Sequence, residues 1–352
     1  MSRPFVPTAA PTTPRHAREA GDGYGATAQP DWRSIDWTAH RHVVALPGDA
    51  FGNTRRGDGT PVNYVDVPAG GVTPSGGSPR SGELEPIVFV HGLGGQWQNW
   101  LENIPRAAQE RRVIALDLPG FGLTPEPRDK ITIPGYGRCV NALCEELSLG
   151  RVDIVGNSMG GYIAAEVAIQ FPERIDQLVL VSAAGITSAG LARRPVLTVG
   201  RVAAAVAAYG AARHRQIASR PISRHIALAL VARHPSLLRA DLAYEGFFKG
   251  TGKPGFDDAL RATLGYDFRD RLPEIRQPTL IVWGEKDSII PVKDAHEFER
   301  LISDSRKVVM TETGHIPMAE RPEAFNELMM DFLAETGPAS AREPVEGESQ
   351  AV

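Results

Sequence analysis

The sequence predicts an α/β protein with a mostly parallel β-sheet, helices on both faces and a helical cap (lid) inserted late in the chain. From residue 87 onward, short segments rich in Val and Ile alternate with longer helix-like segments, a rhythm typical of parallel sheets. This rhythm breaks between residues 186 and 271 and then resumes. With 352 residues, of which 42% are hydrophobic, the chain can bury the core of one large domain plus an insertion.

Eight segments have the composition of strands. The first two precede the alternating region and are expected to form a hairpin-like opening. The other six are short apolar runs rich in branched residues, as expected for strands that are buried on both faces. In chain order the eight segments are 42–46, 62–67, 87–90, 112–116, 151–155, 177–181, 279–283 and 306–310. The clearest helices are expected at 135–148, 159–170, 291–302 and 320–335.

The same patterns divide the chain into regions. Residues 41–185 and 272–336 are predicted to form the core, and residues 186–271 the helical cap. Residues 1–40 are rich in Pro, Ala, Thr and Gly, so we expect a disordered or loosely attached extension there. Residues 337–352 are expected to be a disordered tail.

A serine between two glycines lies where a predicted strand meets a predicted helix. Residues 156–160 read Gly-Asn-Ser-Met-Gly, with Ser158 at the centre. In a turn this tight, side chains on either flank would collide with their neighbours, so glycine is needed at both flanking positions. Such a turn presents the serine hydroxyl as a nucleophile. We therefore expect Ser158 to be the nucleophile and Gly156, Asn157 and Gly160 to support the turn.

Ser158 needs a base to take its proton, and the chain offers one after its last predicted strand. His315 follows the 306–310 strand, and Asp287 follows the 279–283 strand. Open α/β sheets place their sites beyond the carboxyl ends of such strands. We expect His315 to be the base and Asp287 to hold its ring and stabilise the imidazolium. A surface-loop histidine and a turn aspartate are the structural alternatives, and Glu285 and Glu312 are nearby competitors for the acid.

A tetrahedral intermediate also needs donors for its negative oxygen. The backbone N–H of Met159 opens the helix after the serine, where the partial charge of the helix terminus favours an anion. A second group of residues, His91-Gly92-Leu93-Gly94, follows the 87–90 strand. We interpret His91 as a structural residue whose hydrogen bonds brace this loop.

Residues from about 43 to 334 resemble the α/β-hydrolase superfamily. The resemblance rests on the Gly-Asn-Ser-Met-Gly-Gly turn, on the chain order of serine, acid and histidine, and on the Asp-Leu-Pro-Gly-Phe-Gly loop at 117–122. The turn is similar to that of carboxylesterases, monoacylglycerol-type lipases and the carbon–carbon hydrolases of aromatic ring cleavage. The resemblance implies that the backbone N–H of Leu93 is the second oxyanion donor, with Gly92 and Gly94 letting the loop fold close.

Three functions remain open. Hydrolysis of a carboxylic ester through an acyl-serine intermediate is the leading hypothesis, with a hydrophobic substrate that can carry an anionic group. The alternative is carbon–carbon bond hydrolysis of a ring meta-cleavage product, although that family usually has an aromatic residue after its histidine and this chain has Ile316. A non-catalytic ligand-binding protein on a hydrolase scaffold belongs to another class, and nothing in the sequence indicates a missing group.

The first part of the cap has an unusual charge pattern. Residues 186–240 contain nine arginines and neither Asp nor Glu. A solvated helical face whose arginines pair with acids elsewhere explains this pattern. The sharper hypothesis is a basic surface that contacts an anionic substrate or the anionic lipid of a membrane face, with Arg193, Arg194 and Arg201 as candidate contacts.

The remaining composition argues against several other classes. The formal net charge is −4, so nothing in the overall charge suggests nucleic-acid binding. The nine histidines show no metal-ligand spacing, and no phosphate-binding glycine loop occurs, so we expect neither a metal nor a cofactor. The only two cysteines, Cys139 and Cys144, are interpreted as buried free thiols of a reducing compartment. The expected location is the cytoplasm, and the sequence leaves the oligomeric state open.

Overall fold

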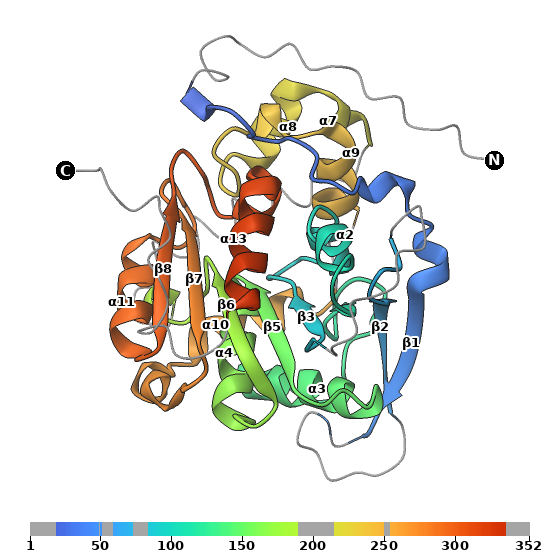
Figure 1. Cartoon of the computed structure of the whole chain (residues 1–352), viewed down its shortest axis with the longest axis vertical. Helices are drawn as coiled ribbons and strands as arrows, with labels where there is room; N and C mark the ends of the chain where they lie inside the picture. Colours follow the sequence, from blue (N-terminus) through green and yellow to red (C-terminus); the bar gives the residue numbers. More distant parts are fainter. Residues whose placement is uncertain are drawn as a thin grey trace.

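The computed structural model describes residues 19–48, 50, 59–72, 84–188, 215–249 and 254–335. Its centre is an eight-stranded sheet in the order β1-β2-β4-β3-β5-β6-β7-β8 (Figure 1). Strand β2 pairs antiparallel with β1 and β4, and all other pairings are parallel. The predicted mostly parallel sheet is therefore confirmed. The strands are β1 (Arg41–Leu46), β2 (Thr60–Val67), β3 (Ile87–Val90), β4 (Val113–Leu116), β5 (Val152–Asn157), β6 (Ile175–Val181), β7 (Thr279–Gly284) and β8 (Ser305–Met310).

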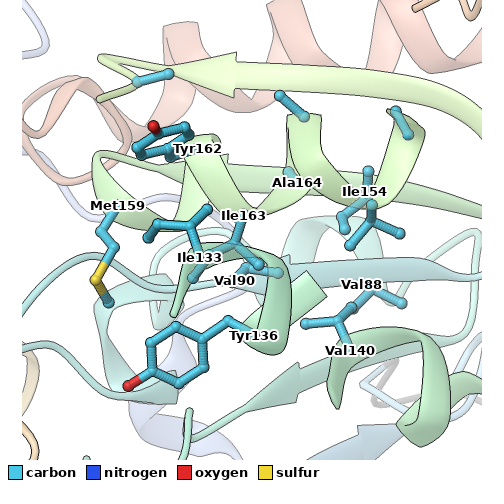
Figure 2. Packing of buried hydrophobic residues seen from close by; sticks show 14 of the residues in the cluster. Val88, Val90, Ile133, Tyr136, Val140, Ile154, Met159, Tyr162, Ile163 and Ala164 are labelled. Carbon is cyan, nitrogen blue, oxygen red and sulfur yellow. The ribbon is translucent and has the colours of Figure 1, made fainter. Parts of the chain in front are cut away.

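Both faces of the sheet are covered, and each face has its own apolar core. In β3, Val88 and Val90 point into one core, whereas Ile87 and Phe89 point into the other. All four side chains are fully buried, which explains why the central strands are continuously apolar in sequence. Figure 2 shows Val88 and Val90 in the first core, with Tyr136 and Val140 from the helix that follows β4.

The helices form two layers. Helices α3 (Ile133–Glu146), α4 (Met159–Gln170) and α11 (Lys293–Leu301) contribute to the first core. Helices α2 (Ile104–Ala107), α12 (Pro317–Glu320) and α13 (Pro322–Ala334) contribute to the second, together with the 3₁₀ turn η3 (Trp97–Trp100). Cys139 and Cys144 of α3 are free and buried, as predicted.

The single helix expected at 320–335 is instead two helices. Arg321 separates α12 from α13 with φ −134° and ψ 63°. It precedes Pro322, and the proline ring disfavours the helical conformation at the residue before it. The Arg321-Pro322 step is therefore a local signal for the end of α12. The break matters because it places Glu320 at the end of a short helix next to His315.

The cap lies between β6 and β7 in the sequence. Its described elements are α7 (Arg215–Ser219), α8 (Pro221–Leu228), η4 (Pro235–Leu237), α9 (Ala240–Leu242), the π-helical turn η5 (Ala243–Phe248), α10 (Phe256–Gly265) and η6 (Arg269–Glu274). Helices α7, α8 and α9 lie together at one end of the molecule (Figure 1). Leu228, Leu242 and Phe248 are buried in the second core. The cap and the α/β core therefore share apolar packing.

The expectation of a loose extension over residues 1–40 is wrong for residues 19–40. The indole N–H of Trp32 donates to Glu102 Oε1 at 2.9 Å, and the backbone N–H of Ala28 donates to Glu102 Oε2 at 2.9 Å. Two 3₁₀ turns follow, η1 (Trp32–Ser34) and η2 (Trp37–His40). Prediction from composition missed this docking because the buried aromatic side chains are few among many Gly and Pro residues. Residues 1–18 and 336–352 lie outside the described residues.

Candidate active site

Ser158 occupies a sharp turn between β5 and α4. Its backbone has φ 57° and ψ −118°, a conformation that a non-glycine residue rarely adopts. The turn is held by its own backbone: the Ser158 N–H donates to the Val181 carbonyl at 2.9 Å, and the Ser158 carbonyl accepts from the Ala184 N–H at 3.0 Å. Such strain costs about 1–3 kcal/mol and persists where the surroundings enforce it. The geometry is that of a nucleophile elbow.

The two glycines around Ser158 are required by contact. A Cβ on Gly156 would lie 2.2 Å from the Gly160 carbonyl oxygen, and a Cβ on Gly160 would lie 2.1 Å from the Val90 carbonyl oxygen. Both distances are far below van der Waals contact, and both partners are backbone atoms that cannot rotate away. The elbow therefore closes only with glycine at both positions, which is the reason the sequence suggested.

Gly156→Ala is expected to lower kcat by about 10²-fold, because the turn must open and displace the serine hydroxyl by an ångström or so. Gly150→Ala is the matched control, since nothing lies within 4 Å of a Cβ at that position. Turnover and circular dichroism should be measured for both variants. A folded Gly156→Ala protein with unchanged kcat would contradict this account of the elbow.

Asp287 and His315 form a hydrogen-bonded pair. Asp287 Oδ2 lies 2.8 Å from His315 Nδ1. Asp287 Oδ1 accepts from the backbone N–H groups of Ile289 and Ile290 at 2.8 and 2.9 Å. The Asp287 side chain is 0% exposed and that of His315 is 6% exposed, so water competes little for the pair. Backbone N–H groups of its own loop therefore fix the orientation in which the Asp287 carboxylate contacts the imidazole.

The two competing acids have other partners. Glu285 Oε2 accepts from the backbone N–H of Glu312 at 3.2 Å, and Glu285 Oε1 pairs with Lys286 at 2.9 Å. Glu312 lies against the Arg233 guanidinium at 3.0 Å and His234 Nε2 at 3.2 Å. Among the described residues, Asp287 is the acid that contacts the ring of His315.

The His315 loop lies beside the elbow. Asn157 Nδ2 donates to the carbonyls of Val181, at 3.1 Å, and of His315, at 3.2 Å. The His315 N–H donates to the carbonyl of Val231 in the cap at 2.8 Å. A Cβ on Gly284 would lie 1.9 Å from the Gly314 carbonyl oxygen, so the end of β7 presses directly on this loop. The Asn157 side chain thus ties the backbone of His315 to the residue that precedes Ser158.

The His91–Gly94 loop also lies against the elbow. A Cβ on Gly92 would lie 3.1 Å from Ser158 Cβ, which leaves little space between loop and nucleophile. Gly94 has φ 75°, and a Cβ there would lie 3.2 Å from the ring of Phe256 in the cap. Neither the Leu93 N–H nor the Met159 N–H donates to another described residue. Both are therefore available to an oxygen bound next to Ser158.

His91 braces this loop. One ring nitrogen, Nδ1, lies 2.7 Å from the Gly92 carbonyl, and the other, Nε2, accepts from the Leu118 N–H at 3.0 Å. Burial lowers the pKa of His91 to about 4, so the ring is neutral near pH 7. Because Nε2 accepts, the proton must be on Nδ1, where it donates to Gly92. Because both of its ring nitrogens are engaged in hydrogen bonds, His91 cannot serve as the catalytic base.

Two carboxylates that contact the site were not singled out from the sequence. Asp117 accepts from the backbone N–H groups of Trp97 and Leu123 at 2.8 Å each, and so joins the loops on either side of β4. In the sequence it stands out only as the first residue of the 117–122 loop. Glu320 accepts from the N–H groups of Gly314 and Ile316, on either side of His315. No local pattern marks a buried glutamate at a helix end.

The cap arginines fall into two groups. The three candidate contacts, Arg193, Arg194 and Arg201, lie outside the described residues. Three of the described ones have side-chain partners within the protein: Arg224 donates to the carbonyls of Ala218 and Ser236, Arg233 pairs with Glu312, and Arg239 pairs with Asp241. Pairing with nearby acids and carbonyls therefore accounts for part of the basic segment.

The described part of the chain contains neither a candidate metal site nor a membrane-spanning helix. Across residues 19–335, apart from the gaps stated above, no group of three or more His, Cys, Asp or Glu side chains could hold a metal ion. No described helix is long and apolar enough to span a bilayer.

A family model described as the alpha/beta hydrolase fold matches residues 85–322, which is more than half of the chain. The chain belongs to the α/β-hydrolase fold family. This membership confirms the resemblance and the fold class predicted from the sequence, and makes the protein a hydrolase of the α/β fold.

Two proteins of known name are similar in sequence to this chain. This α/β hydrolase is 33% identical over 271 residues to the 2-hydroxy-6-oxo-2,4-heptadienoate hydrolase of Pseudomonas putida, a match covering 72% of this chain and 90% of that enzyme. It is 34% identical over 257 residues to a dihydrolipoyllysine-residue acetyltransferase component of an acetoin cleaving system from the same species. That match covers 70% of this chain but only 63%, less than two thirds, of the relative.

A solved structure shows the same fold. The meta-cleavage product hydrolase CumD of Pseudomonas fluorescens IP01 superimposes with a TM-score of 0.59 over 83% of this chain and 96% of that one. Its sequence identity to this α/β hydrolase is 23%, so the likeness supports the fold alone.

Proposed function

We propose that this α/β hydrolase cleaves a carbon–carbon bond next to a ketone in a vinylogous diketone acid, using Ser158, His315 and Asp287. The observation that carries the proposal is the 33% identity to a 2-hydroxy-6-oxo-2,4-heptadienoate hydrolase across 90% of that enzyme. The sequence alone favours ester hydrolysis and offers this reaction as the alternative. Similarity to named relatives reverses that order.

The proposed roles follow from the geometry of the site. His315 takes the proton of Ser158, and the Ser158 oxygen attacks the ketone carbon. The resulting oxyanion accepts hydrogen bonds from the N–H groups of Leu93 and Met159. When the carbonyl reforms, the carbon–carbon bond breaks and its electron pair enters the conjugated fragment that leaves. His315 then returns the proton to the carbon of that fragment at which the bond broke. Water then hydrolyses the acyl-serine, with His315 again as base.

Ester hydrolysis is the second candidate, because it uses the same catalytic groups and its alkoxide leaving group departs more readily than a carbanion. The observation that favours it is Ile316, which follows His315 where the carbon–carbon hydrolases usually have an aromatic residue. Ile316 is 2% exposed and packs in the second core.

A substrate panel separates the two reactions. Purified protein and its Ser158→Ala variant would be given esters of graded chain length and charge, alongside a vinylogous diketone acid. Turnover of the diketone acid at a rate well above that of every ester supports carbon–carbon hydrolysis. Turnover of esters alone overturns it in favour of the second candidate.

The anionic group of such a substrate suggests a role for the basic part of the cap. Arg193, Arg194 and Arg201 are each replaced by Ala. The variant that loses the carboxylate-binding arginine is expected to show a rate ratio of anionic to neutral substrate about tenfold lower than that of the wild type. This is the usual effect of losing a hydrogen bond to a charged group. Arg300→Ala, on the exposed surface of α11, is the control. If none of the three cap variants changes that ratio, these arginines do not bind the substrate.

A fluorophosphonate probe addresses the third function. A working enzyme would be labelled at Ser158, whereas a ligand-binding protein with a misassembled triad would stay unlabelled. Contact of the basic cap with anionic lipid and a cytoplasmic location stay predictions.

A further inference from the structure

Glu320 is a fully buried carboxylate to which several parts of the chain donate hydrogen bonds. Its side chain is 0% exposed. It accepts from the backbone N–H groups of Gly314, at 2.9 Å, and Ile316, at 3.3 Å, which flank His315. It also accepts from the Arg233 N–H in the cap at 2.8 Å and from the hydroxyl of Tyr24. Three segments that are far apart in sequence therefore meet at one side chain.

Tyr24 joins two of these segments. Its hydroxyl donates to Glu320 and accepts from the backbone N–H of His234 at 2.8 Å. Next to it, the Gly25 N–H donates to the Glu320 carbonyl at 2.7 Å. A Cβ on Gly25 would lie 2.6 Å from the Leu237 carbonyl oxygen, so the N-terminal stretch packs closely against the cap. In Figure 1 this stretch, drawn in blue, runs beside the cap helices.

Arg321 holds the same stretch from the other side. Its guanidinium donates to the carbonyl oxygens of Ala20, at 2.5 Å, and Asp22, at 3.2 Å. The same group donates to Thr313 Oγ1 at 2.8 Å, two residues before His315. Glu320 and Arg321 thus connect residues 20–25 to the histidine loop by two independent routes.

The donor pattern at Glu320 fits a carboxylate and leaves little freedom for a neutral group. Burial raises the pKa of Glu320 above its ordinary value, although hydrogen bonds from Tyr24 and from backbone N–H groups act against this rise. Both oxygens of a carboxylate are acceptors only, so the ionised form accepts from all of these donors at once. The carboxylate therefore holds the backbone on both sides of His315, and Asp287 holds the ring itself.

We propose that Glu320 is a positioning residue for His315, and that residues 20–25, through Tyr24, belong to the machinery that sets the geometry of the active site. The proposal rests on the proposed role of His315 as the base, but it does not depend on which bond the enzyme cleaves. It assigns a function to an N-terminal stretch that composition alone marks as a loose extension.

Tyr24→Phe tests the proposal. The variant leaves the buried Glu320 carboxylate without one donor and the His234 N–H without its acceptor, and the histidine loop shifts to compensate. We expect kcat to fall by about 10- to 100-fold, because small displacements of a reacting group have effects of this size. We expect KM to stay within about twofold, because Tyr24 is not proposed to contact the substrate. The low-field proton NMR resonance of the Asp287–His315 hydrogen bond should shift or broaden.

Trp32→Phe is the matched control. It also removes a hydrogen bond from the N-terminal segment to a buried carboxylate, that of Glu102, but no hydrogen bond joins Trp32 or Glu102 to the histidine loop. Its kcat and NMR resonance should match those of the wild type even where the midpoint of thermal unfolding falls. Equal losses of kcat in Tyr24→Phe and Trp32→Phe would overturn the proposal, since docking of the segment alone would then explain both.

Glu320→Gln is a second, independent test of the proposal. One amide oxygen cannot replace two carboxylate oxygens, so the loss of kcat should be at least as large as that in Tyr24→Phe. A wild-type kcat and an unshifted resonance in either variant would overturn the proposal. If the wild-type protein cleaves none of the substrates tested, the proposed function fails, whereas the resonance still reports whether Glu320 and Tyr24 position His315.

Discussion

Ser158→Ala is expected to lower kcat by a factor of about 10⁴ or more, because the proposed mechanism has no other nucleophile. The residual rate would come from the Leu93 and Met159 N–H groups and from substrate binding, which the variant retains. Covalent labelling by a fluorophosphonate should disappear. The measurement is steady-state turnover of the best substrate in the panel.

The control for this variant is Ser148→Ala. Ser148 also has a positive φ, 51°, but lies exposed at the end of α3, so it matches the residue type and backbone conformation without the site. Wild-type turnover is expected for this protein. If Ser158→Ala and the wild type turned over substrate at equal rates, the serine mechanism would be excluded for both candidate reactions.

Asp287→Asn is expected to lower kcat by about 10⁴-fold while leaving the loop in place. The N–H groups of Ile289 and Ile290 both donate to Oδ1, so the amide oxygen of asparagine will occupy that position. Its NH₂ group then faces His315 Nδ1 and forces that nitrogen to accept. The ring proton moves to Nε2, the nitrogen that we propose takes the proton of Ser158. The base is present but in the wrong tautomer.

Glu285→Gln is the comparison for this variant. Glu285 is a neighbouring acid that is exposed and pairs with Lys286 rather than with His315. Its replacement should change kcat by less than about threefold, as expected for an exposed ion pair. Near wild-type turnover in Asp287→Asn would instead require another orienting acid, with Glu312 as the first residue to test.

The strands and the elbow are predictable because their signals are local. A strand buried on both faces must be apolar throughout, and the eight predicted segments match the observed strands to within two residues at each end. The glycines that flank Ser158 form a local pattern: a Cβ on Gly156 would meet the Gly160 carbonyl within the turn, although a Cβ on Gly160 would meet the Val90 carbonyl of β3. Local sequence therefore contains enough information to place the nucleophile at the end of β5.

Partners that are distant in sequence are harder to predict. The sequence offered three acids for His315, and only the folded loop, in which Ile289 and Ile290 donate to Asp287, distinguishes them. The sequence alone does not distinguish ester from carbon–carbon cleavage, because both reactions use the same catalytic groups and differ in how the substrate is held. The described part of the chain does not include the arginines proposed to hold it.

The strands and the Ser158 turn are predictable because their signals lie in short stretches of the chain, and the order of the candidate catalytic groups is read directly from the sequence. The docking of residues 19–40 on the core, and the sharing of Glu320 by Tyr24, Arg233 and the His315 loop, depend instead on contacts between segments that are far apart in the chain. The physical reason is that a buried carboxylate must collect its hydrogen bonds from whatever backbone the fold brings near it. Those donors come from segments separated by up to 296 residues, and no local pattern records them.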